Sequence, residues 1–390
     1  MKRPGFGRTR LAGLAAVAAV AAVASVLAGC ASASSTQEPS APAATSSLAT
    51  SLAAAGGEAW AVVAVGGSAS SENKFWELLT RPAASSQWKL VTPPGIADNG
   101  GLVAAAPAAG QRLDIAVRPD QGLTFSPLAL TGDGGNTWDT GLVDAAVAAV
   151  PDAFASGGGK MLALLTNGTI EQAAAPGSNW TRLATPGSLA TSAAGRHCQV
   201  TELTGVALTA SGTPLAAASC VRPGVVGIFT RPASAWESAG LTLGGQLAGK
   251  PVQVLRLTGT SAGTVALLQA GAGSTADLLA AWSSDGTHWT VSAPAPAGSG
   301  PVRASGTGAD GAVWLLLASG HAVTVSGPGA AWRVLPTPPR GTAALAPVAG
   351  GTFDALAVSG AKLTVFRLGA DGAWRQDQVL NVPIQYGSSS

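Results

Sequence analysis

The sequence has few of the side chains that usually carry out chemistry. Only 11% of its 390 residues are charged, and it contains three histidines, three cysteines and one tyrosine. His197, His288 and His321 lack the spacing of metal ligands, so neither a metal site nor a cofactor is expected. Lys and Arg form no stripe or cluster, which argues against a nucleic-acid partner. Any catalytic set would have to come from residues scattered along the chain.

The first thirty residues differ from the rest of the chain. A basic start is followed by an apolar run from 11 to 29 and then by Cys30, which is the pattern of a secretory signal. With ~20 apolar residues needed to cross a bilayer, a retained membrane-spanning anchor is the alternative. The segment Leu27-Ala-Gly-Cys30 resembles the lipobox of bacterial lipoprotein signal peptides. The resemblance implies cleavage before Cys30, a diacylglyceryl thioether on its sulfur and a protein anchored to membrane lipid on the extracytoplasmic side.

These features divide the chain into four expected parts. Residues 1–29 form the signal peptide, 30–55 a lipidated tether, 56–385 a folded domain and 386–390 a tail. The tether is rich in Ser, Ala and Pro and has almost no large apolar residue, so it cannot bury a core. Cleavage removes four basic and no acidic residues, which changes the formal net charge from +2 to −2.

Cys198 and Cys220 are the remaining cysteines of the mature chain. In an oxidising compartment they most simply form a disulfide, and the alternative is two buried free thiols. The segments Val200–Ala210 and Pro214–Ser219 predict two strands joined by a turn, so the thiols would face each other across one hairpin. Closing this loop would stabilise the fold by about 3 kcal/mol in the chain-entropy account. His197 is adjacent, but a metal site is disfavoured because further ligands are lacking.

Short apolar runs alternate with clusters of Gly, Ser, Pro, Asn and Asp from Glu58 onward. Examples are Trp60–Val65, Met161–Leu165 and Val265–Leu268. No stretch keeps an apolar period of 3.6 residues between two caps, because Gly and Pro interrupt it. Many short strands at even spacing predict an all-β fold.

A tryptophan followed by a short strand-like segment recurs at intervals of 42 to 56 residues. The seven positions are Trp88, Trp138, Trp180, Trp236, Trp289, Trp332 and Trp374. Repeats of ~40–50 residues with four short strands each are typical of β-propellers, which have ~4–8 blades. The sequence therefore predicts a β-propeller of seven four-stranded blades. The first unit lacks an opening strand before Trp60, which either residues near Leu48–Leu52 or the tail Val379–Ile384 would supply.

Two of the units carry a sharper motif. The segment Thr131-Gly-Asp-Gly-Gly-Asn-Thr-Trp138 fits the pattern Ser/Thr-x-Asp-x-Gly-x-Thr-Trp, and Ser283-Ser-Asp-Gly-Thr-His-Trp289 is one residue shorter. The motif resembles the Asp-box, or BNR repeat, of sialidase-like propellers, sortilin-type receptors and photosystem II assembly factor-like proteins. The resemblance implies that Asp accepts backbone N–H bonds, Gly takes a positive φ and Trp packs between sheets. The residues with these structural roles are Asp133, Gly135, Trp138, Asp285, Gly286 and Trp289.

The residues present disfavour the obvious enzymatic activities. The sialidases that the motif resembles bind a carboxylate through three arginines and use a tyrosine nucleophile, and here the single tyrosine is Tyr386, in the tail. No carboxylate pair forms a local motif for glycoside hydrolysis, and no Gly-x-Ser-x-Gly segment supports Ser-His-Asp catalysis. Asp114, Asp120 and Asp354 are carboxylate candidates only because they lie near strand ends.

One stretch is dense in charge and supplies the candidate binding residues. It contains Arg112, Asp114, Arg118 and Asp120. These side chains would line the mouth of the central channel, and the alternative is that they are solvated charges at strand ends. We expect a non-catalytic binding or scaffold propeller with a protein or glycan ligand. The alternatives are a glycosidase-like enzyme and an assembly factor for a membrane complex.

Overall fold

The structure is a computed structural model. It describes residues 49–53, 58–65, 75–82, 85–93, 101–105, 112–117, 124–296, 301–348, 351–360 and 362–381. The predicted signal peptide, Cys30, Arg118, Asp120 and Tyr386 lie outside these residues. In the described part of the chain, no helix has the length and apolar character needed to span a bilayer.

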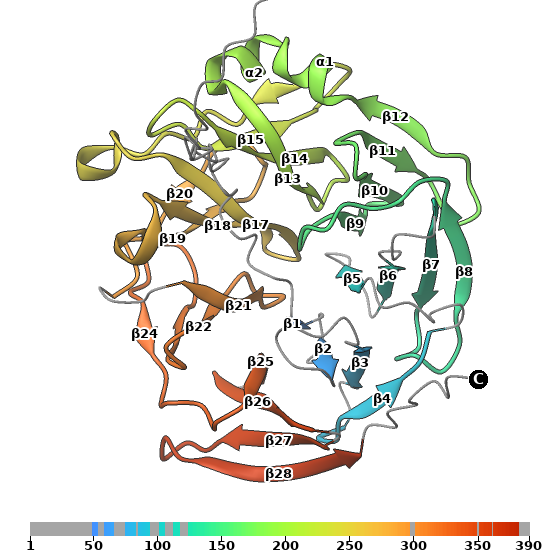
Figure 1. Cartoon of the computed structure of the whole chain (residues 1–390), viewed down its shortest axis with the longest axis vertical. Coiled ribbons are helices and arrows are strands. Elements are labelled where there is room, and N and C mark those ends of the chain that lie inside the picture. Colours follow the sequence, from blue (N-terminus) through green and yellow to red (C-terminus); the bar gives the residue numbers. More distant parts are fainter. Residues whose placement is uncertain are drawn as a thin grey trace, which may run out of the picture. The chain divides into compact units, whose positions relative to one another are not determined.

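The described strands form seven blades arranged in a ring, which confirms the predicted β-propeller (Figure 1). Each blade has four strands that follow one another in chain order, each antiparallel to the one before. The first strand of each blade is the innermost and the fourth is the outermost.

The blades are numbered along the chain. Blades 1 and 2 consist of β1 (Ala49–Ala53), β2 (Ala59–Val65), β3 (Phe75–Arg81), β4 (Lys89–Val91), β5 (Leu102–Ala105), β6 (Leu113–Val117), β7 (Ser126–Thr131) and β8 (Asp139–Val143). Blades 3 and 4 consist of β9 (Phe154–Gly157), β10 (Lys160–Leu164), β11 (Ile170–Ala173), β12 (Thr181–Ala184), β13 (Val200–Leu208), β14 (Pro214–Cys220), β15 (Gly227–Thr230) and β16 (Glu237–Ser238).

Blades 5 to 7 complete the ring. They consist of β17 (Val252–Thr260), β18 (Gly263–Ala270), β19 (Asp277–Ser283), β20 (Thr290–Val291), β21 (Val302–Thr307), β22 (Val313–Leu317), β23 (Ala322–Val325), β24 (Arg333–Val334), β25 (Thr342–Val348), β26 (Thr352–Ser359), β27 (Lys362–Leu368) and β28 (Trp374–Asn381). Several strands are buried at every residue, among them β6 and β22, the second strands of blades 2 and 6. Such strands carry apolar residues on both faces because each blade packs between two others.

The seven repeated tryptophans mark the outermost strand of each blade. Six stand directly before that strand, and Trp374 is the first residue of β28. Three of their indole N–H groups donate to a carbonyl of the preceding blade: Trp180 to Leu142 at 2.9 Å, Trp332 to Ala293 at 2.9 Å and Trp374 to Pro336 at 3.0 Å. The repeat found in the sequence is therefore a set of contacts between neighbouring blades.

The ring closes without sharing a blade between the two ends of the chain. β1 pairs with β2, so the segment before Trp60 opens blade 1, as one of the two sequence-based alternatives expected. Residues Val379–Asn381 belong to the outermost strand of blade 7. β1 also forms a parallel bridge to β21 of blade 6, between Leu52 and Thr307. The inner edges of blades 6 and 1 therefore meet.

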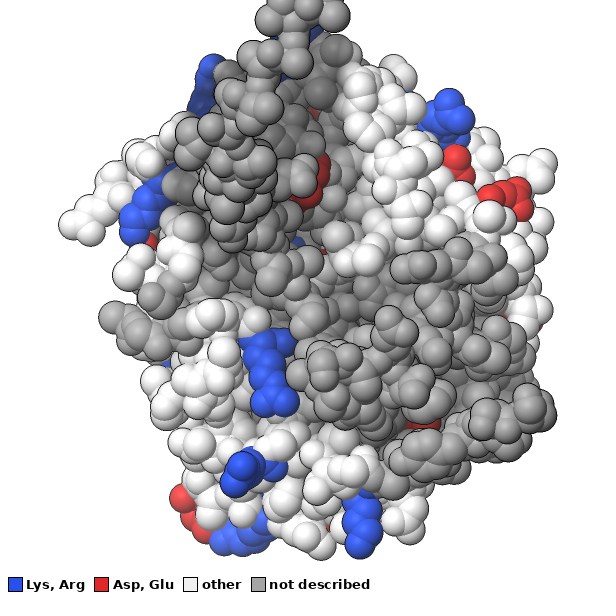
Figure 2. Space-filling view, in the orientation of Figure 1, with Lys and Arg blue, Asp and Glu red and all other residues white. Residues whose placement is uncertain are grey.

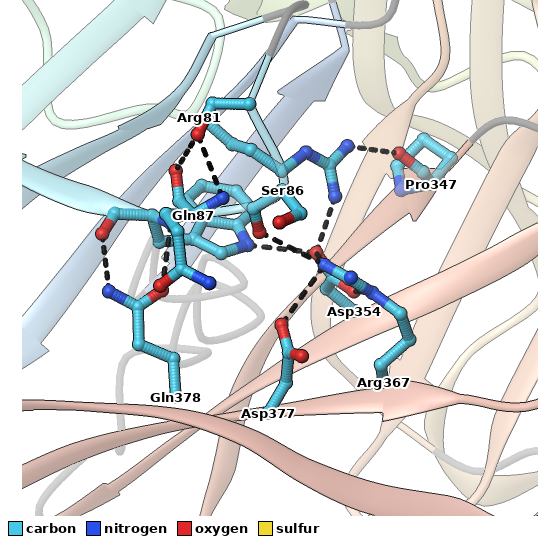
Figure 3. A network of polar contacts seen from close by, with 10 residues as sticks. Arg81, Ser86, Gln87, Pro347, Asp354, Arg367, Asp377 and Gln378 are labelled. Carbon is cyan, nitrogen blue, oxygen red and sulfur yellow. Dashed lines mark hydrogen bonds and ion pairs between the residues drawn. The ribbon is translucent and has the colours of Figure 1, made fainter.

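A buried polar network joins blade 7 to blade 1 (Figure 3). The Asp354 carboxylate on β26 is fully buried and accepts hydrogen bonds from Arg81 and from Trp88 Nε1, the latter at 2.8 Å. Arg367 Nε donates to the other Asp354 oxygen at 2.9 Å. Arg81 also donates to the Pro347 carbonyl at 3.1 Å, and its guanidinium lies 5.3 Å from the centre of the Trp88 ring. Both oxygens of Asp354 are therefore hydrogen-bonded within the interface between blades 7 and 1.

A side chain of the last strand completes this seam. The Gln378 amide accepts the Trp88 N–H at 2.8 Å and donates to the Trp88 carbonyl at 2.7 Å (Figure 3). It thereby satisfies both polar backbone groups of Trp88 next to the edge strand β4. Side-chain contacts hold this seam in place of a shared blade.

Two short helices lie between blades 3 and 4, where the sequence predicted none. Thr185 and Ser188 form a capping box at the start of α1 (Pro186–Ala190), and Ser192 caps α2 (Ala193–Cys198). Each helix is under two turns long, so neither shows an apolar period. The caps and Pro186 were the only local signals for them.

The predicted disulfide between Cys198 and Cys220 is confirmed, with a Cα–Cα distance of 4.9 Å. The two predicted strands correspond to β13 and β14, which pair antiparallel. Cys198 ends α2 and Cys220 ends β14. The bond therefore fastens the helical connection to the second strand of blade 4.

Candidate functional site

The innermost strands of blades 2 to 5 surround a narrow pocket, here called the channel pocket. Its free volume is about 30 Å³, which holds a few water molecules but no sugar ring or peptide side chain. Its walls come from β5, β9, β13 and β17, which face the centre of the ring (Figure 1). The small residues Ala104, Ala105 and Ala155 let these strands approach one another.

Asp152 and Arg256 form a buried ion pair in the channel pocket. Arg256 Nε lies 3.0 Å from both carboxylate oxygens of Asp152, and Nη2 lies 2.9 Å from Oδ1. The Leu257 N–H donates to Oδ2 at 2.8 Å, and Arg256 Nη1 donates to the Ser305 carbonyl at 2.8 Å. The pair links blades 3, 5 and 6. Its polar atoms are engaged within the protein, so it stabilises the channel wall and offers little to a ligand.

A wider pocket lies between blades 2 and 3 and shares Ser156 with the channel pocket. It is called the rim pocket and has a volume of about 180 Å³. Arg112 and Asp114 of blade 2 line one side. The other side is formed by Ser156, by the glycine turn that ends at Lys160 and by Ala174–Pro176 of blade 3.

The rim pocket contains a buried carboxylate that is only half satisfied. Arg112 Nε donates to Asp114 Oδ1 at 2.7 Å, with Arg112 46% exposed and Asp114 fully buried. Asp114 Oδ2 and Ser156 Oγ are both buried without a well-formed hydrogen bond among the described residues. Burial raises the pKa of the Asp114 carboxyl, and Arg112 and Ser156 lower it by less. Ser156 thus lies close enough to lower the Asp114 pKa, although its hydroxyl makes no hydrogen bond of good geometry with the carboxylate.

The structure brings together two of the four residues predicted for binding. Arg112 and Asp114 form an ion pair at the rim pocket, whereas Arg118 and Asp120 lie outside the described residues. Sequence reasoning missed Asp152, Arg256 and Ser156. Arg256 stands inside the apolar run of β17, and a charge within a buried strand requires a partner. A charged residue in a buried strand was therefore the sequence signal for an ion pair at Arg256. The sequence could not identify Asp152 as the partner, because the two residues are 104 positions apart and meet only when the ring closes.

In the turn that begins at Thr131, the aspartate accepts hydrogen bonds from the backbone of the same turn. Asp133 Oδ1 accepts the N–H groups of Asn136 and Thr137 at 3.0 and 2.9 Å, and Gly135 has a φ of 82°. The hydrogen bonds from Thr137 and Thr131 hold the pKa of the Asp133 carboxyl well below its usual range. The Trp138 side chain packs against the core between blades 1 and 2.

The turn that begins at Ser283 has the same arrangement. Asp285 Oδ1 accepts the N–H groups of Thr287 and His288, each at 2.8 Å, and Gly286 has a φ of 80°. The His288 side chain, with Nδ1 2.6 Å from Asp285 Oδ2, is the main cause that lowers the pKa of the Asp285 carboxyl. Trp289 Nε1 donates to the Gly286 carbonyl at 3.3 Å. Both aspartates therefore shape turns.

Charged side chains are sparse on the surface of the described residues. On the face shown in Figure 2 they are scattered among larger uncharged areas, and neither sign forms a broad patch among the residues drawn in colour. The coloured residues of this face therefore offer no broad electrostatic surface to a charged partner.

Comparisons with known proteins support the fold. No protein-family model matches the chain, and no curated protein matches its sequence. Among solved structures, the chain is similar to a GH74 xyloglucanase from Xanthomonas campestris, with a TM-score of 0.55 and 15% identity over 84% of this chain and 53% of that one. The chain thus spans about half the length of that protein.

Two further structures align over most of both chains. YCF48 from Cyanidioschyzon merolae has a TM-score of 0.46 and 15% identity over 88% of this chain and 98% of that one. A six-bladed fungal lectin from Aleuria aurantia has a TM-score of 0.40 and 13% identity over 87% and 96%. At these identities the likeness concerns the fold alone. The chain is a seven-bladed β-propeller.

Proposed function

We propose that this chain is a lipid-anchored, extracytoplasmic propeller that binds a ligand at the rim pocket without transforming it. The observation that carries the proposal is the fully buried Asp114 carboxylate, which lines the rim pocket with Ser156 and whose Oδ2 makes no well-formed hydrogen bond. A buried polar group without a partner costs free energy, which a ligand that supplies the missing hydrogen bonds recovers. The fitting ligand presents an amine, guanidine or hydroxyl group, as a peptide or a glycan does.

Crosslinking in the membrane tests this proposal. The lipidated protein is crosslinked in its native membranes, and the captured partners are identified by mass spectrometry for wild type, Asp114→Asn and Asp139→Asn. Asp139 is an exposed residue of β8 and provides the matched control. We expect a partner that wild type and Asp139→Asn capture and Asp114→Asn loses. Equal capture by all three proteins would contradict binding at the rim pocket.

The membrane anchor has its own test. Metabolic labelling with a palmitate analogue should mark the wild-type chain and not Cys30→Ser, and the variant should keep its signal peptide. The Leu27–Cys30 motif supports this expectation. Labelling that survives the substitution would place the lipid elsewhere.

A glycoside hydrolase is the second candidate function. The raised pKa of Asp114 favours it, because such a carboxyl can act as a general acid. Hydrolysis also needs a second carboxylate that is free to act as a base or nucleophile. Asp152 lies in the adjoining channel pocket, but Arg256 and the Leu257 N–H already occupy both of its oxygens. Turnover of chromogenic glycosides that disappears in Asp114→Asn would establish the enzyme in place of the binding protein.

A further inference from the structure

A third pocket lies between blades 5 and 6, and its lining residues are distant in sequence from those of the rim pocket. It is called the interblade pocket and has a volume of about 360 Å³, which lies within the ~300–1,000 Å³ typical of small-molecule sites. The turns after β17 and β19 form one side, and residues of blade 6 form the other. Its lining includes Thr264, Trp282, His288, Trp289 and Asp310.

Two tryptophans line the interblade pocket, of which Trp282 is only 7% exposed and Trp289 is partly exposed. Trp282 Nε1 donates to the Gly311 carbonyl at 2.7 Å, and Trp289 Nε1 donates to the Gly286 carbonyl at 3.3 Å. Since both indole N–H groups have backbone partners, the side chains are fixed, and the partly exposed Trp289 ring offers apolar surface to a ligand. A ligand with a flat face of C–H groups fits such surfaces.

Polar groups with spare hydrogen-bonding capacity stand beside the two rings. Thr264 is 1% exposed, and its Oγ1 has no hydrogen-bond partner among the described residues. Asp310 Oδ1 accepts the Ala312 N–H at 3.1 Å, and the carboxylate makes no ion pair within the described part of the chain. The imidazole of His288 is 90% exposed and is oriented by Asp285 through its Nδ1. A hydroxyl, a carboxylate and an imidazole edge therefore line one hollow.

This combination selects against two other classes of ligand. A purely apolar molecule would bury Thr264 Oγ1 and desolvate Asp310 without replacing their hydrogen bonds with water. An anion would meet the carboxylate of Asp310, with no Lys or Arg in the lining to compensate. A neutral ligand with several hydroxyl groups and one apolar face satisfies all of these groups.

We propose that the interblade pocket binds a neutral hexopyranose unit of a glycan. The ring carbons lie on the Trp289 indole, and the sugar hydroxyls pair with Thr264 Oγ1, with Asp310 and with His288. The site is made of blades 5 and 6 and shares no lining residue with the rim pocket. It is thus independent of the function proposed above.

Saturation-transfer NMR with methyl hexopyranosides tests the proposal on the purified lipidated protein in mild detergent. The probes are the methyl glycosides of glucose, galactose, mannose and N-acetylglucosamine. We expect saturation transfer to the ring protons of at least one of them, and binding about tenfold weaker in Asp310→Asn. Thr264→Val keeps the shape of the side chain and removes only an unpartnered hydroxyl, so it should weaken binding without lowering the thermal midpoint.

Asp139→Asn is the matched control, because Asp139 is an exposed residue of β8 that lines neither pocket. Unchanged sugar binding in Asp139→Asn, together with weaker binding in both interblade variants, supports the interblade site. The proposal is overturned if no glycoside receives saturation, or if Asp310→Asn and Thr264→Val bind like wild type. Loss of binding only in Asp114→Asn would also overturn it and would assign the sugar to the rim pocket.

Discussion

Single residues in this propeller are constrained most tightly where a turn meets a neighbouring blade. Gly135 has a φ of 82°, and a Cβ at this position would lie 2.8 Å from Val91 Cγ1 of blade 1. Gly132, three residues earlier, has open space where its Cβ would be. The same turn thus contains one glycine that is required and one that is replaceable.

Gly135→Ala should therefore destabilise the fold by about 1–3 kcal/mol, through backbone strain and overpacking. Gly132→Ala should change the free energy of unfolding by less than about 0.5 kcal/mol. Urea unfolding followed by tryptophan fluorescence measures both. Equal midpoints for the two variants would show that the contact with Val91 relaxes freely.

The buried carboxylate of Asp114 affects stability as well as binding. Its pKa is raised in the folded protein, so the folded state binds more protons than the unfolded state from about pH 4 upward. The contribution of Asp114 to the free energy of unfolding is fully present at low pH. It is lost as the pH rises through the pKa that Asp114 has in the folded protein. Asn does not titrate, so the free energy of unfolding of Asp114→Asn lacks this dependence on pH.

We therefore expect the stability of wild type relative to Asp114→Asn to fall as the pH rises above about 4. Thermal midpoints of both proteins across the acidic range measure the difference. A constant difference at every pH would mean that the Asp114 carboxyl has the same pKa in both states. A residue that costs stability in the free protein but lines a pocket is typical of a binding site.

At the scale of elements, the sequence was most informative where the repeat is periodic. Each of the seven tryptophans lies at the start of an outermost strand, and three of them donate an indole hydrogen bond to a carbonyl of the preceding blade. The helices α1 and α2 interrupt this period and are too short for one of their own, so only their caps indicated them. Local signals therefore predicted the blades better than the insertion.

The candidate sites were less predictable for the same physical reason. Asp152 and Arg256 belong to blades 3 and 5, and Asp114 and Ser156 to blades 2 and 3. Closing the ring brings such residues together, and no local pattern records which positions will meet. The charged stretch around Arg112 could be found in the sequence because its residues are close together in the chain. Ser156, on the other side of the rim pocket, could not.

The disulfide acts at this scale because it ties α2 to blade 4. Replacing both Cys198 and Cys220 by Ala should lower the free energy of unfolding by about 3 kcal/mol, with the loop-closure entropy as the main term. Chemical denaturation of wild type and of the double variant under non-reducing conditions measures the loss. A reducing agent should shift wild type toward the variant and leave the variant unchanged. A double variant as stable as wild type would limit the role of the bond to local order.

At the scale of the whole molecule, the seam between blades 7 and 1 differs from the six other interfaces. Each of the others joins blades that are consecutive in the chain, whereas this one brings β3 and β4 against β26, β27 and β28 through side chains (Figure 3). Opening the seam exposes two blade faces at once. Its stability should therefore control the cooperative unfolding of the ring.

Asp354→Ala tests this directly, because it leaves the buried Arg81 without a carboxylate partner and removes one of the two carboxylates that contact Arg367. The expected loss is about 3–5 kcal/mol, as for other buried ion pairs that lose one partner. Asp377→Ala removes only a 3.2 Å contact between partly exposed groups and should cost less than about 1 kcal/mol.

Urea unfolding that is monitored by both fluorescence and circular dichroism separates opening of the seam from a local effect. If the seam controls the ring, Asp354→Ala moves both transitions together and by the same amount. Replacing Arg81, Asp354 and Arg367 together by apolar residues of similar size should recover much of the stability, because no charge then stays buried and unpaired. A triple variant as unstable as Asp354→Ala would show that the geometry of the network, and not its unpaired charge, holds the ring closed.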